Sequence, residues 1–258
     1  MRYIAAAASD IGRRHTNQDS LCVKIAKLDG KEDIVMALMC DGMGGLSKGE
    51  LASASLIHAF SAWFDDELPK GNMPLTLAYV MEEWRKVLEV QSRRFHKYER
   101  DKHIKLGTTF SGLFILNDEY MTMQIGDSRI YCVFDDVVKQ LTEDQTVAMQ
   151  EYKLGNLSKE EALTDSRRNI LLQCVGVTKH IKPVVTLGKI QEKSTFILCS
   201  DGQYHTLKKE DLFNLANPSR FHDLRALKDS CEILVRKAKE RNEKDNISII
   251  MIGGDFIG

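Results

Sequence analysis

The stretch that organises this chain is Ile34–Gly45, with the sequence IVMALMCDGMGG. An unbroken apolar run that ends at a turn signal predicts a strand buried on both faces. Asp41 is the first ionisable group after the run, so we expect the fold to hold this carboxylate at the rim of its core. Gly42, Gly44 and Gly45 would let the backbone adopt positive φ and approach a ligand closely. The alternative is that Asp-Gly marks an ordinary hairpin turn.

Length and composition are those of an ordinary soluble globular protein. The 258 residues are 43% apolar and 28% charged, and we expect a single domain over residues 1–258. Thirty-six basic and 37 acidic residues leave a net charge of −1, so no global field would attract nucleic acid or an anionic membrane. We expect neither as a partner.

The cysteines and the apolar segments favour a reducing, cytoplasmic location. The six cysteines include no C-x-x-C pair and the seven histidines are scattered, which argues against a disulfide framework and a zinc site. The N-terminal apolar run is too short for a signal peptide. No stretch approaches the roughly 20 apolar residues that span a bilayer.

Periodicity and turn signals place the secondary structure. Strands are predicted at 3–8, 21–27, 34–40, 108–116, 120–125, 130–134, 137–141, 184–190, 195–199 and 247–252. Helices are predicted at 51–64, 75–98, 158–163 and across 224–238, and residues 142–180 are otherwise irregular. The sequence Ser47-Lys-Gly-Glu50 is a capping-box pattern that would open the first helix.

The order of these elements predicts the fold class. Short connections among the four strands between residues 108 and 141 predict an antiparallel meander. Strands come in groups with helices gathered between them, which favours an α+β fold of antiparallel sheets covered by helices over a doubly wound parallel sheet.

Five aspartates lie at the predicted strand ends. Asp41, Asp127 and Asp201 follow strands, whereas Asp19 and Asp245 precede them. Gathered at one edge in a partly desolvated site, these carboxylates would repel each other by several kcal/mol unless cations were bound. Oxygen ligands without histidines or thiolates indicate Mg²⁺ or Mn²⁺, and two such ions would acidify a bridging water and clamp a phosphoryl group. The alternative for each aspartate alone is a turn or a strand cap.

Motifs of other enzyme classes do not fit. Residues 44–49 have the glycine spacing of a P-loop, but Glu50 follows them where a P-loop has lysine and then serine or threonine. The chain contains no H-E-x-x-H and no C-x5-R loop. The sequence leaves a Ser/His/Asp triad open, although nothing points to one.

Eight motifs in order resemble the metal-dependent protein phosphatase 2C family, and most of all its compact bacterial members. The resemblance runs from about residue 3 to 253. The motifs are RHTNQD (14–19), CDGMGG (40–45), LGTT (106–109), IGDSR (125–129), LTEDQ (141–145), SRRNILLQCVG (166–176), LCSDG (198–202) and DNIS (245–248).

This resemblance implies a four-layer αββα sandwich, in which two antiparallel sheets are flanked by helices and metal ions bind at one end. It implies that Asp41 bridges two ions and that the carbonyl oxygen of Gly42 assists. Asp201 and Asp245 would complete the shell of the first ion, and Asp19 would act near the second.

The resemblance also implies further roles near these ions. Asp127, together with Asp201, would hold a weaker third ion. Arg14 would bind the substrate phosphate, for which a guanidinium has suitable bidentate geometry. Residues 146–169 match the family's flap beside the active site, which is thought to influence substrate choice.

Several positions depart from the family pattern. Gln18 stands where many relatives have Glu, which removes a negative charge near the second ion. Met43 stands where animal members have a histidine proposed as general acid, and methionine cannot transfer a proton. Gln145 replaces a frequent histidine. Because the five aspartates are all present, we still expect an active enzyme.

The resemblance therefore predicts a Mg²⁺- or Mn²⁺-dependent phosphatase of phosphoserine and phosphothreonine in proteins, in which a metal-bridging hydroxide attacks phosphorus. A monomer that opposes a Ser/Thr kinase is expected by analogy with the family. Two alternatives stay open: a catalytically weak or inactive binding module that kept the fold, and a hydrolase of small phosphate esters.

Overall fold

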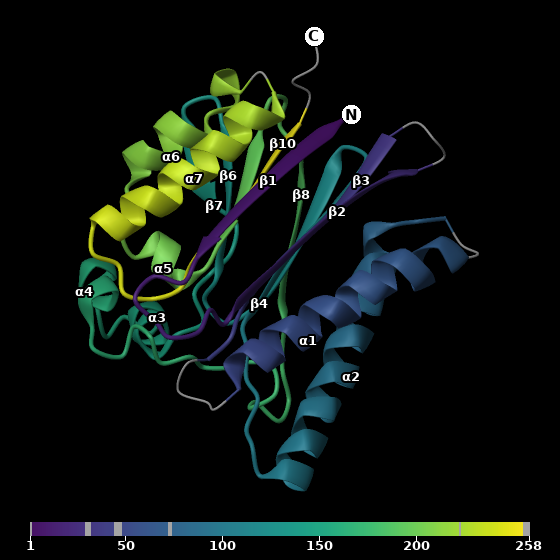
Figure 1. Cartoon of the computed structure of the whole chain (residues 1–258), viewed down its shortest axis with the longest axis vertical. Coiled ribbons are helices and arrows are strands. Elements are labelled where there is room, and N and C mark those ends of the chain that lie inside the picture. The colour runs from purple at the N-terminus through teal and green to yellow at the C-terminus, as the bar shows by residue number, and fades with distance from the viewer. Residues whose placement is uncertain (1, 29–31, 44–47, 72–73, 222, 255–258) are drawn as a thin grey trace.

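The computed structural model describes residues 2–28, 32–43, 48–71, 74–221 and 223–254. Two five-stranded antiparallel sheets are stacked face to face, and helices cover both outer faces (Figure 1). This arrangement confirms the predicted α+β fold with αββα layers. Within the described ranges, no helix is both long and apolar enough to cross a membrane.

The two sheets draw their strands from distant parts of the chain. The first sheet has the order β1 (Tyr3–Asp10), β10 (Ile247–Gly254), β9 (Thr195–Cys199), β6 (Arg129–Phe134) and β7 (Val137–Gln140). The second has the order β2 (Asp19–Leu28), β3 (Glu32–Asp41), β4 (Phe110–Leu116), β5 (Glu119–Ile125) and β8 (Val184–Lys189).

The helices form the outer layers and one end of the molecule. Helices α1 (Gly49–Ala62) and α2 (Leu77–Lys102) cover the second sheet, and α6 (Lys209–Ala216) and α7 (Leu224–Glu240) cover the first (Figure 1). The short helices α3 (Val147–Lys153), α4 (Lys159–Thr164) and α5 (Asp201–Tyr204) lie together at one end of the sandwich (Figure 1). Short helical turns at Trp63–Glu67, Leu68–Lys70 and Pro218–Arg220 complete the set.

Strand β3 is buried on both faces, as its sequence predicts. Met36, Leu38 and Cys40 pack toward α1 and α2, whereas Val35 and Met39 pack between the two sheets. All five side chains are fully buried. This alternation is the reason that the strand needs apolar residues at every position and that Asp41 comes at the point where burial ends.

The predicted meander is wrong at its centre. Strands β4 and β5 pair, and so do β6 and β7, but β5 and β6 belong to different sheets and β6 pairs with β9 instead. The connection at residues 126–128 therefore crosses from one sheet to the other. A short connection keeps two strands close, but it does not decide whether they share hydrogen bonds or face each other across a sandwich.

Several short helices were also missed. No helix was predicted for the residues of α3, α5 or α6, each of which has at most eight residues. The predicted helix at 158–163 is confirmed as α4, with a capping box between Ser158 and Glu161. The proposed cap at Ser47 and the glycines at 44 and 45 lie outside the described residues.

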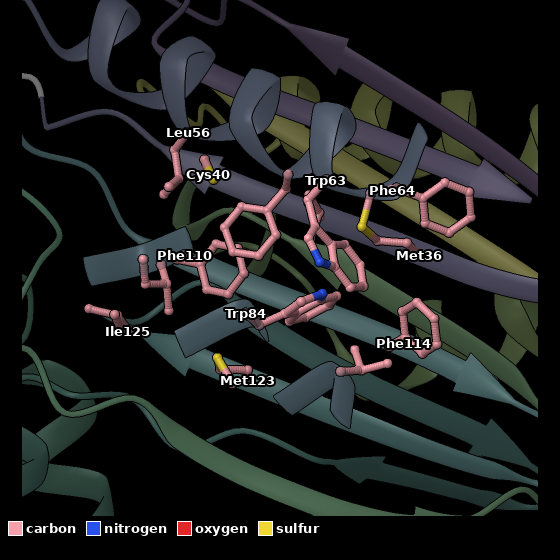
Figure 2. Close-up of a cluster of buried hydrophobic side chains, with 14 of the residues drawn as sticks. Met36, Cys40, Leu56, Trp63, Phe64, Trp84, Phe110, Phe114, Met123 and Ile125 are labelled. Atoms are coloured by element: carbon pink, nitrogen blue, oxygen red, sulfur yellow. The ribbon is translucent and has the colours of Figure 1, made fainter. Parts of the chain in front are cut away.

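An aromatic cluster packs α1 and α2 onto the second sheet (Figure 2). The ring of Trp84 on α2 lies edge-on to Phe60, Phe110 and Phe114, with centroids 5.3, 5.9 and 6.0 Å away. Gly112 on β4 leaves room for this indole, because a Cβ there would lie 2.5 Å from a Trp84 ring carbon and 2.9 Å from Cζ of Phe110. The cluster thus depends on a glycine in the middle of a strand.

Gly112→Ala should lower the free energy of unfolding by about 1–3 kcal/mol, because rings on both sides must shift to admit the methyl group. Urea unfolding followed by tryptophan fluorescence measures the effect. Gly71→Ala is the matched control, since its new Cβ would meet nothing closer than 3.4 Å and its φ is −59°. An unchanged urea midpoint in Gly112→Ala would contradict this account of the packing.

Candidate metal centre

All five sequence-predicted aspartates come together at one end of the sandwich. Asp19 and Asp41 lie opposite each other in the register of β2 and β3. Arg129 pairs with Cys199, so Asp127 and Asp201 leave neighbouring strands side by side, each two residues outside that pair. Burial, and then the charges of the other four aspartates, raise the pKa of Asp41 well above its usual value.

Two threonines hold the backbone around Asp41. The N–H of Asp41 donates to Thr109 Oγ1 at 2.9 Å, and Thr108 Oγ1 donates to the Asp41 carbonyl at 2.9 Å. Thr109 also shares a 2.8 Å hydrogen bond with Ser128, the residue after Asp127. The two threonines of the LGTT motif therefore connect, through hydrogen bonds, the segments that carry Asp41 and Asp127.

One of the two carboxylate oxygens of Asp19 is buried without a hydrogen-bond partner among the described residues. Its Oδ2 accepts a 2.8 Å hydrogen bond from Ser200, whereas its Oδ1 is buried and finds no hydrogen-bond partner among the described residues. Burial, opposed by hydrogen bonds and reinforced by the charges of Asp201 and Asp245, raises the pKa of Asp19 to about 7. A buried carboxylate oxygen without a partner is costly unless a cation or another donor reaches it.

Asp127 lies on the crossing between the sheets and is 5% exposed. The preceding Gly126 has φ of +100°, and its N–H donates to Gln145 Oε1 at 2.8 Å. Gln145 thus supports the turn that presents Asp127, a role for which its amide is sufficient. Burial, followed by the charges of Asp201 and Asp144, raises the pKa of Asp127 to about 7.

Arg14 reaches the cluster from the loop between β1 and β2. Its Nε and Nη2 donate to the two carboxylate oxygens of Asp245 at 2.9 and 2.6 Å. Asn246 holds this loop through the carbonyls of Ile11 and Thr16. Gly12, with φ of +62°, packs so closely that a Cβ would lie 1.9 Å from the Asp245 carbonyl oxygen. Two predicted site residues, Arg14 and Asp245, are therefore already a bidentate pair.

Sequence reasoning missed several polar neighbours of the cluster. His205 lies 4.0 Å from Asp201 and 3.7 Å from Glu243. Burial lowers the pKa of His205, but the neighbouring Glu243 and Asp201 outweigh it and the net shift is upward. On the other side, Glu50 accepts a 3.2 Å hydrogen bond from Gln18. None of the eight family motifs includes His205 or Glu50, and each becomes a neighbour of the cluster only through the fold.

Gly42 and Met43 follow Asp41 at the same end. The N–H of Gly42 donates to the Gln18 carbonyl at 3.0 Å, and the N–H of Met43 donates to the Gly107 carbonyl at 3.0 Å. A Cβ at position 42 would lie 2.3 Å from the Gly49 carbonyl oxygen, so this position requires glycine. The predicted carbonyl ligand is thus held in a closely packed turn beside Asp41.

The donor set fits hard divalent cations. It consists of oxygen atoms, it is partly desolvated, and its like charges raise one another's pKa values. In the part of the chain that the structure describes, no three such side chains are already drawn together around one point. Three of the aspartates, Asp245, Asp19 and Asp127, accept hydrogen bonds from Arg14, Ser200 and Tyr204, respectively. A cation bound by Asp245 would take the place of Arg14.

The fold and this carboxylate cluster define a two-sheet sandwich with an acidic site at one end. Residues 8–232 match the family model described as Protein phosphatase 2C. The chain belongs to the protein phosphatase 2C family and is a phosphatase, a hydrolase of phosphate esters.

Two curated relatives are similar over nearly their whole length. The Serine/threonine phosphatase stp of Listeria monocytogenes is 28% identical over 253 residues, which are 96% of this chain and 94% of the relative. Protein phosphatase PhpP of Streptococcus pneumoniae is 29% identical over 250 residues, which are 95% and 94% of the two chains.

Solved structures share the fold. Serine/threonine phosphatase Stp1 from Staphylococcus aureus superposes with a TM-score of 0.85 at 21% identity, over 98% of this chain and 95% of that one. The catalytic domain of PstP in complex with two manganese ions gives 0.76 at 23% identity, over 97% of each chain.

Proposed function

We propose that this chain is a Mg²⁺- or Mn²⁺-dependent protein phosphatase that hydrolyses phosphoserine and phosphothreonine. The observation that carries the proposal is the convergence of five aspartates, with one buried carboxylate oxygen unpartnered among the described residues, next to an arginine. Such a cluster is electrostatically unfavourable without cations and provides the ligands that these cations prefer.

Each aspartate has a part in holding the ions. Asp41 would contact two of them, with Asp201 and Asp245 on the first and Asp19 near the second. Asp127 with Asp201 would hold a weaker third ion. Gly42 would contribute its carbonyl oxygen. Bound divalent ions supply Lewis acidity, lower the pKa of water and neutralise charge on a phosphoryl group.

Arg14 and the residues around it would handle the substrate. The guanidinium of Arg14, which now pairs with both carboxylate oxygens of Asp245, would bind two oxygens of the phosphate in the same bidentate geometry if Asp245 held a cation instead. Met43 has no proton to donate, so the leaving alkoxide of serine or threonine would take its proton from a water molecule or leave without assistance. No cysteine or other side chain is required as a covalent nucleophile in this scheme.

The substrate class is inferred from relatives. The names of the Listeria and Staphylococcus proteins specify serine/threonine phosphatases. We extend that activity to this chain, together with the predictions of an opposing Ser/Thr kinase, a monomeric state and a cytoplasmic location. Residues 146–169 are proposed as the flap beside the active site, and the chain as one catalytic domain.

Hydrolysis of a phosphothreonine peptide should require Mn²⁺ or Mg²⁺ and stop when EDTA is added. Phosphate release by the purified protein measures this, and a panel of small metabolite phosphates under the same conditions is the comparison. Metal-dependent release from the peptide in preference to the metabolites is expected. A folded protein that releases phosphate from neither substrate class would support the binding-module alternative, and preference for metabolites would support the small-ester alternative.

A further inference from the structure

Tyr204 links the candidate metal centre to the network around Arg129. It is the last residue of α5, three positions after Asp201, and its hydroxyl donates to Asp127 Oδ2 at 3.2 Å. The guanidinium of Arg129 lies over the Tyr204 ring, with its central carbon 3.6 Å from the ring centroid. The phenol is therefore held on its face by a cation and at its tip by a carboxylate.

Arg129 is itself held in place. Its Nε and Nη2 donate to the two oxygens of Asp144 at 2.9 and 2.6 Å, and its Nη1 donates to the hydroxyl of Tyr131 at 3.0 Å. The side chains of Arg129 and Asp144 are only 15% and 8% exposed. A bidentate, largely buried pair has little rotational freedom, so it presents a rigid cationic surface to the ring of Tyr204.

The same residues line a cavity of about 520 Å³. Its lining includes Arg129, Asp144 and Tyr204, together with Met149 from α3 and Leu163 from α4. Residues of the segment 146–169 and Tyr204 therefore line the same cavity, and the hydroxyl of Tyr204 donates to Asp127. Tyr204 therefore contacts the candidate metal centre and also lines the cavity.

We propose that Tyr204 is a positioning residue, which orients Asp127 to bind a divalent cation, and that the Arg129–Asp144 pair holds Tyr204 for this purpose. The inference rests on the metal centre proposed above. By donating to Oδ2, the hydroxyl of Tyr204 fixes the rotation of the Asp127 carboxylate and so the direction in which its oxygens face a cation. Partners of this kind, which touch a ligand but not the ion, typically contribute 10–100-fold to metal affinity.

Tyr204→Phe tests the proposal because it removes the hydroxyl and keeps the ring under Arg129. Tyr131→Phe is the matched control: its hydroxyl also contacts Arg129 but, among the described residues, makes no hydrogen bond to an aspartate of the cluster. Calorimetric titration of each metal-free protein with Mn²⁺ gives the number of sites and their dissociation constants. Thermal unfolding in EDTA shows whether either change disturbs the fold.

We expect Tyr204→Phe to weaken one Mn²⁺ site by about 10–100-fold, to leave the remaining affinity within about twofold, and to unfold within a few degrees of the wild type. Tyr131→Phe should titrate like the wild type. Identical Mn²⁺ binding by Tyr204→Phe and the wild type would overturn the role of Tyr204 alone. Absence of Mn²⁺ binding in the wild type itself would overturn the metal centre, and so the two failures are distinguishable.

Discussion

Asp41→Asn should lower the turnover of a phosphothreonine peptide at saturating Mn²⁺ by about 10³-fold or more. Asp41 is the residue whose pKa is affected by the charges of all four other aspartates, so it lies at the electrostatic centre of the site. Replacing its carboxylate with a neutral amide weakens binding of both ions that it is proposed to contact. Loss of several kcal/mol of charge stabilisation in the transition state corresponds to a factor of this size.

The matched control for this experiment is Asp229→Asn. Asp229 is exposed on α7, on the outer face of the first sheet, and the substitution also replaces one carboxylate with an amide. Its turnover should stay within about twofold of the wild type, because surface charges far from a site contribute little at physiological salt. Near-wild-type turnover in Asp41→Asn at saturating Mn²⁺ would refute the proposed mechanism.

The same substitution should have opposite effects on stability with and without metal. In EDTA, the free energy of unfolding of Asp41→Asn should exceed that of the wild type by about 1–2 kcal/mol, because one like charge is removed from the cluster. With Mn²⁺ at 100 times its dissociation constant, the wild type gains about 2.7 kcal/mol and the variant gains less. Thermal unfolding of both proteins in each buffer measures this change in their relative stability. A variant less stable than the wild type in EDTA would contradict it.

The pH dependence of this difference has a defined sign. Burial, and then the charge of Asp19, raise the pKa of Asp41 in the folded protein. The folded state therefore binds more protons than the unfolded state. The contribution of Asp41 to the free energy of unfolding is present at low pH and is lost as the pH rises through the pKa of Asp41 in the folded protein. In EDTA, the stability advantage of Asp41→Asn should grow as pH rises from about 5 to 8. If the stability advantage of Asp41→Asn became smaller over this pH range, the upward shift in the pKa of Asp41 would be refuted.

Local sequence patterns determined the elements that carry the site. The unbroken apolar run of 34–40 could only be a strand with both faces buried, and Asp41 had to come where that burial ends. The Ser158 and Glu161 pair could be recognised as a helix cap, because both residues act within one helical turn. The aspartates could be recognised as a set because each one adjoins a strand end, and antiparallel strands bring alternate ends to the same edge.

Pairings over long distances in the chain were decided by the tertiary structure. Whether β6 joins β5 or β9 depends on which apolar faces complete the core between the sheets, and the three residues between β5 and β6 allow both arrangements. The contacts of Arg14 with Asp245 and of Tyr204 with Asp127 join residues 231 and 77 positions apart. The sequence by itself determined which residue types stand at strand ends. Only the packed sheets decided which of them touch, because side-chain contacts depend on the relative placement of whole strands.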